Sequence, residues 1–180
     1  MKSTFFTISI LVGSLLVGST YAKEVKDVVP ELVQAATNPV VIKAVKEQNA
    51  KGVTLVRIQE LDKAWEAAKE PDAFMKSHTT NPAALELAKI EKSKPYFVEF
   101  ILTDNQGANV SITGMTSDYW QGDEPKFINA FADGKGEIYI ARPQKDKSTG
   151  EVISQVSVPV KSDGKVIGTL TVGVRAEKLK

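Results

Sequence analysis

The stretch that decides the fold is residues 152–174, VISQVSVPVKSDGKVIGTLTVGV. Both of its halves are rich in Val, Ile and Thr, and Ser162-Asp163-Gly164 between them has the composition of a tight turn. Successive side chains of a strand point to opposite faces, and in both halves one set of alternate positions is mainly aliphatic. The pattern predicts an antiparallel hairpin of two strands, residues 152–160 and 165–174.

The two faces of this hairpin differ in chemistry. Alternation assigns to one face Val152, Val156, Val158, Val160, Val166, Leu170, Val172 and Val174, together with Ser154. It assigns to the other face Ile153, Gln155, Ser157, Pro159, Ile167, Thr169 and Thr171. The aliphatic face is suited to packing on helices, whereas the mixed face is either solvated or the polar floor of a ligand pocket.

Three more strands are predicted upstream, at residues 96–103, 109–115 and 137–141, from runs of β-forming residues. Most connections between the strands are too short for parallel crossovers, so the five-stranded sheet is expected to be mainly antiparallel. The longer join between the second and third strands contains a predicted helix at residues 123–132. Phe127, Ile128 and Phe131 are its expected buried side.

The part before residue 95 is expected to be helical. Apolar residues recur at three- and four-residue spacing in segments 28–36, 40–49, 54–69 and 81–90, and two of these begin with Asn-Pro. His78 falls in a polar stretch predicted to be a surface loop. The expected fold class is α+β, with N-terminal helices (residues 23–94) packed on a five-stranded sheet (residues 95–180) in one domain, residues 23–180.

The first 22 residues have the pattern of a secretory signal peptide. Lys2 supplies the positive charge, residues 5–18 form an apolar run, and small residues precede a cleavage site after Ala22. An uncleaved membrane anchor is the alternative, although several Ser and Thr residues weaken it. The protein is therefore expected to be exported, either periplasmic or secreted from a bacterium.

Composition excludes most familiar enzyme chemistry. The chain has no Cys and one His, which excludes thiol catalysis, zinc-thiolate sites and multi-histidine metal sites. Its net charge of +1 gives no basis for nucleic-acid binding. A hydrolase or isomerase would need an acid pair converging on His78, and nothing in the sequence indicates one. We expect no enzyme activity, no cofactor and no metal.

The segment at residues 115–127, MTSDYWQGDEPKF, is the chemically richest part of the chain. It places Tyr119 and Trp120 side by side among Asp118, Asp123 and Glu124, and aromatic groups with a few polar ones are typical of ligand pockets. The simpler interpretation is that Trp120 anchors the loop and that the acids cap the following helix.

In the order of these segments the chain resembles the PDC/Cache family of extracytoplasmic sensor domains, in a single-Cache form. The resemblance rests on the helical N-terminal region, the turn Asp104-Asn105-Gln106-Gly107, the loop at residues 117–124, the strand at residues 137–140 and the hairpin ending at residues 168–174. It implies a PAS-like fold with a small-molecule pocket on the sheet face away from the N-terminal helix. The ligands it implies are mostly carboxylates, amino acids or related metabolites.

Carried onto this chain, the resemblance implies a ligand site with a roof and a floor. The roof residues are Asp118, Tyr119 and Trp120, and the floor residues are Tyr139, Gln155, Ser157 and Thr169. Lys126 and Arg142 are candidate partners for a ligand carboxylate, because both are cationic hydrogen-bond donors. An outward position of Lys126 on its helix and a strand-end role for Arg142 before Pro143 are the alternatives.

The expected function is that of an exported module that recognises a small organic metabolite. Members of the resembled family usually sit between two membrane-spanning helices and signal to a cytoplasmic module. This chain ends at Lys180, shortly after its last strand, and no second hydrophobic segment follows. We therefore expect it to relay ligand binding to the extracytoplasmic part of a membrane receptor. A protein–protein adaptor of the same fold, without a ligand, is the alternative.

Overall fold

A computed structural model describes residues 24–145 and 150–179 of the chain. The predicted signal peptide, residues 1–22, lies outside the described residues. The helical part consists of a short 3-10 turn, η1 (Val25–Val28), followed by α1 (Val29–Ala36), α2 (Pro39–Ala50), α3 (Leu55–Ala67), α4 (Ala73–Thr80) and α5 (Pro82–Lys92). The sheet part consists of β1 (Phe97–Thr103), β2 (Asn109–Ile112), α6 (Pro125–Phe131), η2 (Ala132–Gly134), β3 (Tyr139–Ile140), β4 (Gln144–Lys145), β5 (Val152–Ser162), β6 (Lys165–Val174) and η3 (Ala176–Lys178).

The strands form one antiparallel sheet in the order β2-β1-β6-β5-β3, and β4 pairs with the start of β5. The predicted α+β class and the five antiparallel strands are confirmed. β4 is a sixth, two-residue strand that the sequence did not predict, because Gln144 and Lys145 carry no β-forming signal.

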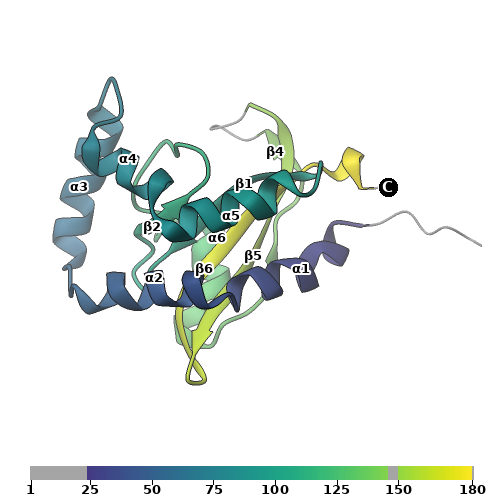
Figure 1. Cartoon of the computed structure of the whole chain (residues 1–180), viewed down its shortest axis with the longest axis horizontal. Coiled ribbons are helices and arrows are strands. Elements are labelled where there is room, and N and C mark those ends of the chain that lie inside the picture. Colours follow the sequence, from purple (N-terminus) through teal and green to yellow (C-terminus); the bar gives the residue numbers. More distant parts are fainter. Residues whose placement is uncertain (1–23, 146–149, 180) are drawn as a thin grey trace, which may run out of the picture.

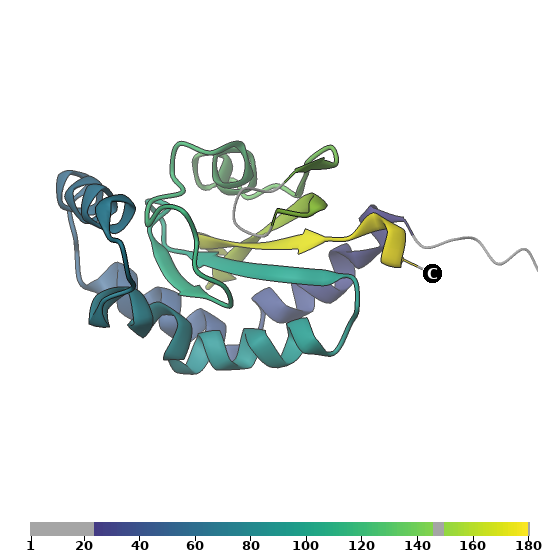
Figure 2. The same ribbon diagram turned by 90° about the horizontal axis from the view of Figure 1, so that it is seen from above.

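The molecule has three layers, and the sheet is the middle one (Figure 2). Helices α1, α2 and α5 cover one face of the sheet, and α6 lies on the other face (Figures 1 and 2). The main core lies between the sheet and helices α1, α2 and α5, where the aliphatic face of the hairpin supplies Val156, Val158, Val160, Leu170, Val172 and Val174. This part of the predicted aliphatic face is confirmed.

Two other residues predicted for the aliphatic face lie elsewhere. Val160 pairs with Gly168 and Lys161 with Val166, so Ile167 is an extra residue in β6. Such a bulge exchanges the faces of the residues beyond it. Ile167 therefore packs on the main core, whereas Val166 lies on the α6 side, 2.6 Å from the position that a Cβ of Gly136 would take.

Val152 is also outside the core, with 61% of its surface exposed. It lies beyond the last residue of β5 that pairs with β6, Ser154, and among the described residues it pairs with Lys145 of β4. The prediction for Val152 was wrong because alternation predicts which face of the sheet a residue is on. It does not predict how far along the strand the helices cover that face.

The prediction of a surface loop around His78 was wrong. His78 lies on α4 and is only 7% exposed. The helix begins at Asp72, whose carboxylate accepts a hydrogen bond from the backbone N–H of Met75 at 2.8 Å. Its Ser and Thr side chains bond to carbonyls three or four residues earlier, as Thr80 does to Lys76 at 3.0 Å. A helix of this composition has almost no apolar periodicity, so the sequence pattern did not reveal it.

One residue of α6 was also assigned to the wrong side. The buried residues of this helix are Lys126, Phe127 and Ala130, whereas Ile128 is 52% exposed. Successive residues of a helix are separated by about 100°, so a short helix that buries Phe127 and Ala130 turns Ile128 outward.

Candidate functional site

The aromatic segment between β2 and α6 is fastened to α3. One carboxylate oxygen of Asp62 accepts hydrogen bonds from the backbone N–H groups of both Tyr119 and Trp120, each at 2.8 Å. The indole N–H of Trp65, also on α3, donates to the carbonyl of Thr116 at 2.9 Å. These contacts give the segment one conformation, since a charged acceptor strengthens both of its bonds.

Tyr119 turns toward α3 and α4. Its ring stacks on Trp65 with centroids 5.7 Å apart and meets His78 edge-to-face at 5.4 Å. Only 2% of its surface is exposed, and burial raises the pKa of its hydroxyl to about 12. The hydroxyl accepts a long hydrogen bond from the Gln48 carboxamide, at 3.4 Å. Tyr119 is therefore part of a second hydrophobic cluster, with Ile58, Trp65, Met75, Ile101, Ala108 and Ile112.

Trp120 is half-buried and closes the turn between β1 and β2. Its indole N–H donates to the carbonyl of Gln106 at 2.7 Å, and Ala108 forms an isolated bridge with it. Gly122 lies so close to the indole that any side chain at this position would collide with it. This geometry agrees with the simpler interpretation of Trp120 as an anchor, and it leaves ligand contact by the same residue a prediction.

Two buried carboxamides meet at Asp118. Asn109 donates to the Asp118 carbonyl at 3.1 Å and to the Thr116 hydroxyl at 3.0 Å. Gln121 donates to the same carbonyl at 3.1 Å and to the Asp118 carboxylate. Both carboxamides are fully buried, yet within the described residues neither of their oxygen atoms, Asn109 Oδ1 and Gln121 Oε1, has a hydrogen-bond partner. Buried polar atoms without partners are rare, and each is a place where a water or a ligand atom can bind.

Lys126 lies in the first turn of α6 and is only 6% exposed, so its alternative outward position is wrong. Its ammonium is 2.7 Å from the carboxylate of Glu124, whose side chain is 35% exposed. Burial of an ammonium is costly unless a negative group compensates it, and here the compensating group is partly in solvent. Between Gln121 and Lys126 the chain makes a turn, in which Glu124 N–H donates to the Gln121 carbonyl at 3.1 Å.

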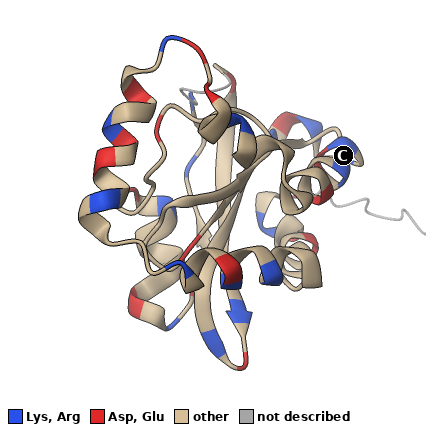
Figure 3. Cartoon of the chain, turned by 60° about the vertical axis from the view of Figure 1, so that its left-hand side comes forward, with Lys and Arg blue, Asp and Glu red and all other residues tan. Residues whose placement is uncertain are grey.

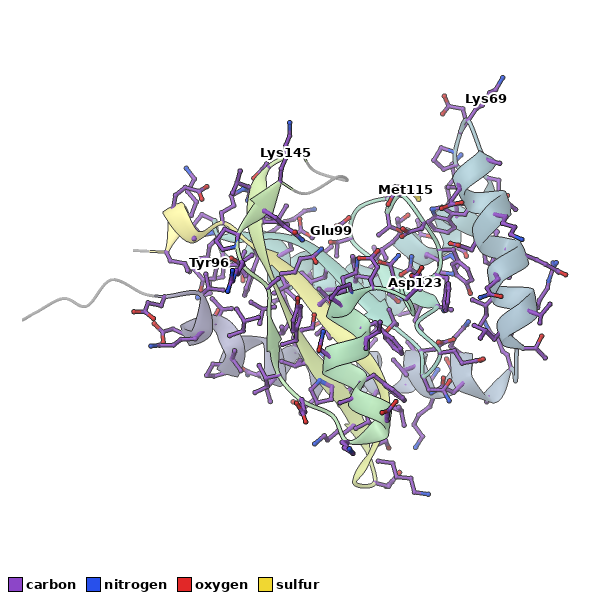
Figure 4. All side chains as sticks on the ribbon, turned by 180° about the vertical axis from the view of Figure 1, so that it is seen from behind. Lys69, Tyr96, Glu99, Met115, Asp123 and Lys145 are labelled. Atoms are coloured by element: carbon purple, nitrogen blue, oxygen red, sulfur yellow. The ribbon has the colours of Figure 1, made fainter. Side chains whose placement is uncertain are left out.

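The mixed face of the hairpin is covered, which excludes a solvated face. Helix α6 packs on β5 and β6 over this face (Figure 4). Ser157 and Thr169 are fully buried, and their hydroxyls form cross-strand hydrogen bonds, Ser157 with Thr171 at 2.8 Å and Thr169 with Thr103 at 2.7 Å. The predicted floor is thus polar and enclosed, and its hydroxyls already have partners.

The remaining predicted site residues are more exposed. Tyr139 pairs across the sheet with Ser157 and is half-buried, as is Gln155. Arg142 is exposed, beyond the end of β3. The structure therefore brings Tyr139 to Ser157, places Lys126 in the interior and turns Tyr119 toward other helices. Asn109 and Gln121 were not predicted as site residues. The signals that could have indicated them are a polar residue in a predicted strand, for Asn109, and a position directly after Tyr119-Trp120, for Gln121.

Within the described ranges, no group of three or more His, Asp or Glu side chains is placed to hold a metal ion. None of the helices between residues 24 and 179 that the structure describes has the length and apolar character to cross a membrane. Lysine and arginine residues are interspersed with acidic ones along the ribbon in Figure 3. The candidate site residues offer hydrogen-bonding side chains, aromatic rings and single charges.

No protein-family model matches the chain, and no curated protein sequence matches it. Solved structures with similar folds include the sensor domain of the V. cholerae histidine kinase DctB, with 13% identity, a TM-score of 0.46, and 84% of this chain and 48% of that chain covered. They also include the ligand-binding domain of the Campylobacter jejuni chemoreceptor Tlp3 in complex with 4-methylisoleucine (16% identity, TM-score 0.46, 86% and 61% covered). A third is the ligand-binding domain of the Pseudomonas fluorescens chemoreceptor CtaA in complex with L-valine (18% identity, TM-score 0.43, 86% and 64% covered).

The first is the sensor domain of a histidine kinase, and the other two are ligand-binding domains of chemoreceptors. The chain spans about half the length of the DctB domain and less than two thirds of the other two. The likeness concerns the fold.

Proposed function

We propose that this domain binds a small organic molecule with a carboxylate group, of the amino-acid type, between α6 and the mixed face of the sheet. The observation that carries the proposal is the buried ammonium of Lys126, in the same short segment as the unpartnered carboxamide oxygen of Gln121. A cation and free hydrogen-bond acceptors are the two kinds of group that an amino acid requires.

The roles of these groups follow from their charges. A ligand carboxylate would bind the Lys126 ammonium and replace the Glu124 carboxylate, which is partly exposed and can turn to solvent. A ligand amino group would donate to the free oxygens of Gln121 and Asn109, both linked through Asp118. Each bond from the ligand amino group would satisfy a buried oxygen that has no partner within the described residues, which makes it more favourable than the exchange of an existing bond.

The other predicted residues are assigned supporting roles in the same proposal. Trp120 and Tyr139 supply aromatic walls, and Gln155, Ser157 and Thr169 supply the floor. Because the Ser157 and Thr169 hydroxyls are already paired, a ligand would reach them only after α6 moves away from the sheet. Arg142 is proposed as an exposed second cation at the entrance.

The wider role that we propose is that of an exported sensor module, periplasmic or secreted, which relays ligand binding to the extracytoplasmic part of a membrane receptor. The signal-peptide pattern at residues 1–22 supports export. An adaptor of the same fold without a ligand is the second candidate. The observation that favours it is that the Ser157 and Thr169 hydroxyls on the mixed face already form hydrogen bonds with other hydroxyls.

A thermal-shift screen of amino acids, dicarboxylates and amines tests the proposal. Amino acids or carboxylates should raise the melting temperature of the wild-type protein, because a ligand that binds only the folded state stabilises it. Lys126→Met should abolish this rise, and Lys135→Met, at an exposed lysine, should retain it. The absence of any stabilising compound would favour the adaptor.

Trp120→Ala tests the predicted roof separately. The variant loses the hydrogen bond to Gln106, so its melting temperature without ligand should fall. If Trp120 contacts the ligand, the additional rise caused by ligand should also disappear. An undiminished rise, measured against the unliganded variant, would show that Trp120 only anchors its own loop.

A further inference from the structure

A cavity lies away from α6, between α2, α4, the start of α5 and β2. Its volume is about 580 Å³, within the range of small-molecule sites. Of the residues predicted for the site under α6, Tyr119 lines this cavity. Lys126, Gln121 and Asn109, which are proposed to bind the amino acid, do not line it. It is therefore a separate candidate site, and its chemistry can be argued from its own lining residues.

The wall formed by α2 has its own periodicity. Val41 and Val45 of this helix are buried in the main core. Val40, Ala44, Gln48 and Lys51 recur at three- and four-residue spacing on the adjacent face and line the cavity. The small side chain of Ala44 leaves space in the middle of this wall, as Ala83 does on the side of α5.

The floor of the cavity is apolar and aromatic. Its buried members are Tyr119, His78, Val110 and Ala83, and Phe74 lies at its side. The His78 and Phe74 rings meet edge-to-face at 4.7 Å, and Phe74 meets Tyr119 at 5.2 Å. This floor suits a flat aromatic or branched aliphatic group, because ring edges and faces pack well on such groups.

The rim of the cavity carries charge. Lys43 and Glu47 pair with each other along α2. Lys51 donates to the Gln48 carboxamide at 3.0 Å, and no ion pair involving it is found in the part of the chain that the structure describes. Burial of the imidazole lowers the pKa of His78, and the nearby charge of Lys51 has a smaller effect in the same direction. The rim therefore favours an anionic group over a cationic one.

We infer that this cavity is a second ligand site, for a small molecule with an apolar, preferably aromatic body and one anionic group. The body would lie on the floor formed by Tyr119, His78 and Val110, and the anion would face Lys51. The inference does not depend on the amino-acid site under α6, because the two sites use different cations, Lys51 here and Lys126 there.

Titration of the ¹⁵N-labelled protein with 2-naphthoate, followed by amide chemical shifts, tests the inference without any variant. Saturable shifts are expected in residues 40–51 and 74–83. The cation 2-naphthylmethylammonium, of similar size, should bind more weakly. Shifts confined to residues 115–127, equal binding of the cation, or the absence of saturable shifts would overturn the inference.

Variants then test the assigned walls. Ala44→Trp fills the cavity and should weaken 2-naphthoate binding about tenfold or more, whereas Ala50→Trp, at an exposed position of the same helix, should leave it unchanged. Lys51→Met should weaken binding about fivefold, and Lys63→Met, on α3, should not. Lys126→Met should retain 2-naphthoate binding, which separates this site from the one under α6. Unaltered affinity in Ala44→Trp would contradict the inference.

Discussion

The carboxylate of Asp62 determines where the aromatic segment lies. It accepts two backbone N–H groups, those of Tyr119 and Trp120, from a segment more than fifty residues further along the chain. Asp62 lies at helical spacing from Ile58 and Trp65, but the sequence does not indicate which distant backbone groups its carboxylate meets. Side-chain contacts between distant segments depend on how the layers pack, which local periodicity does not encode.

Asp62→Ala should therefore destabilise the fold. It leaves two N–H groups of a partly buried segment without their charged acceptor, so we expect the free energy of unfolding to fall by about 2 kcal/mol. Urea denaturation measures this change. Glu66→Ala, at an exposed position of the same helix, is the matched control and should change the free energy by less than about 0.5 kcal/mol. Equal effects of the two substitutions would mean that the Asp62 contacts do not stabilise the segment.

His78 gives the fold a defined response to acid. Burial lowers the pKa of its imidazole below the ordinary value of 6.5, although a backbone bond to Phe74 opposes the shift. Below pH 6.5 the unfolded chain therefore binds a proton that the folded protein does not. The neutral imidazole therefore makes its full contribution to the free energy of unfolding above pH 6.5. This contribution is lost as the pH falls toward the lowered pKa.

His78→Phe keeps an aromatic ring beside Trp65, Phe74 and Tyr119 but removes the titration. Melting temperatures of both proteins between pH 7.5 and pH 5 measure its contribution. The wild-type melting temperature should fall further than that of the variant over this interval. Parallel profiles would contradict the assignment of a lowered pKa to His78.

At the scale of elements, Gly168 of β6 lies directly against the backbone of β1. A Cβ at this position would overlap the carbonyl oxygen of Thr103, which is backbone and cannot turn aside. Gly168→Ala should therefore separate the two central strands and lower the free energy of unfolding by about 2 kcal/mol or more. Gly114→Ala is the control, because its nearest neighbour is the flexible end of Glu99. Similar urea midpoints for the two variants would show that the strands have room to adjust.

The elements that the sequence predicted correctly are those with strong periodicity. Alternation in β5 and β6 correctly predicts most of the face that packs on the helices, where Val156, Val158, Val160, Val172 and Val174 are fully buried. Helix α4 was missed because its capping and hydrogen bonds come from polar side chains. The bulge at Ile167 was missed because it depends on the pairing of two strands and not on the composition of either.

At the scale of the whole molecule, the arrangement of the layers explains why the candidate site could be only partly predicted. The resemblance pointed to the mixed face of the sheet, and α6 does cover that face with Lys126 turned inward. The direction of Tyr119 and the pairing of the hydroxyls could not be predicted. Both depend on how α3, α4 and α6 pack around the sheet, and local sequence patterns do not predict this packing.

The central claim is that a small carboxylate binds beneath α6 at Lys126. Calorimetric titration of the wild-type protein and of Lys126→Met, with the most stabilising compound of the thermal-shift screen, tests it most directly. The account predicts saturable heat with the wild-type protein, an affinity at least about tenfold weaker with Lys126→Met, and no change with Lys135→Met. Equal affinity of the wild-type and Lys126→Met proteins would contradict it.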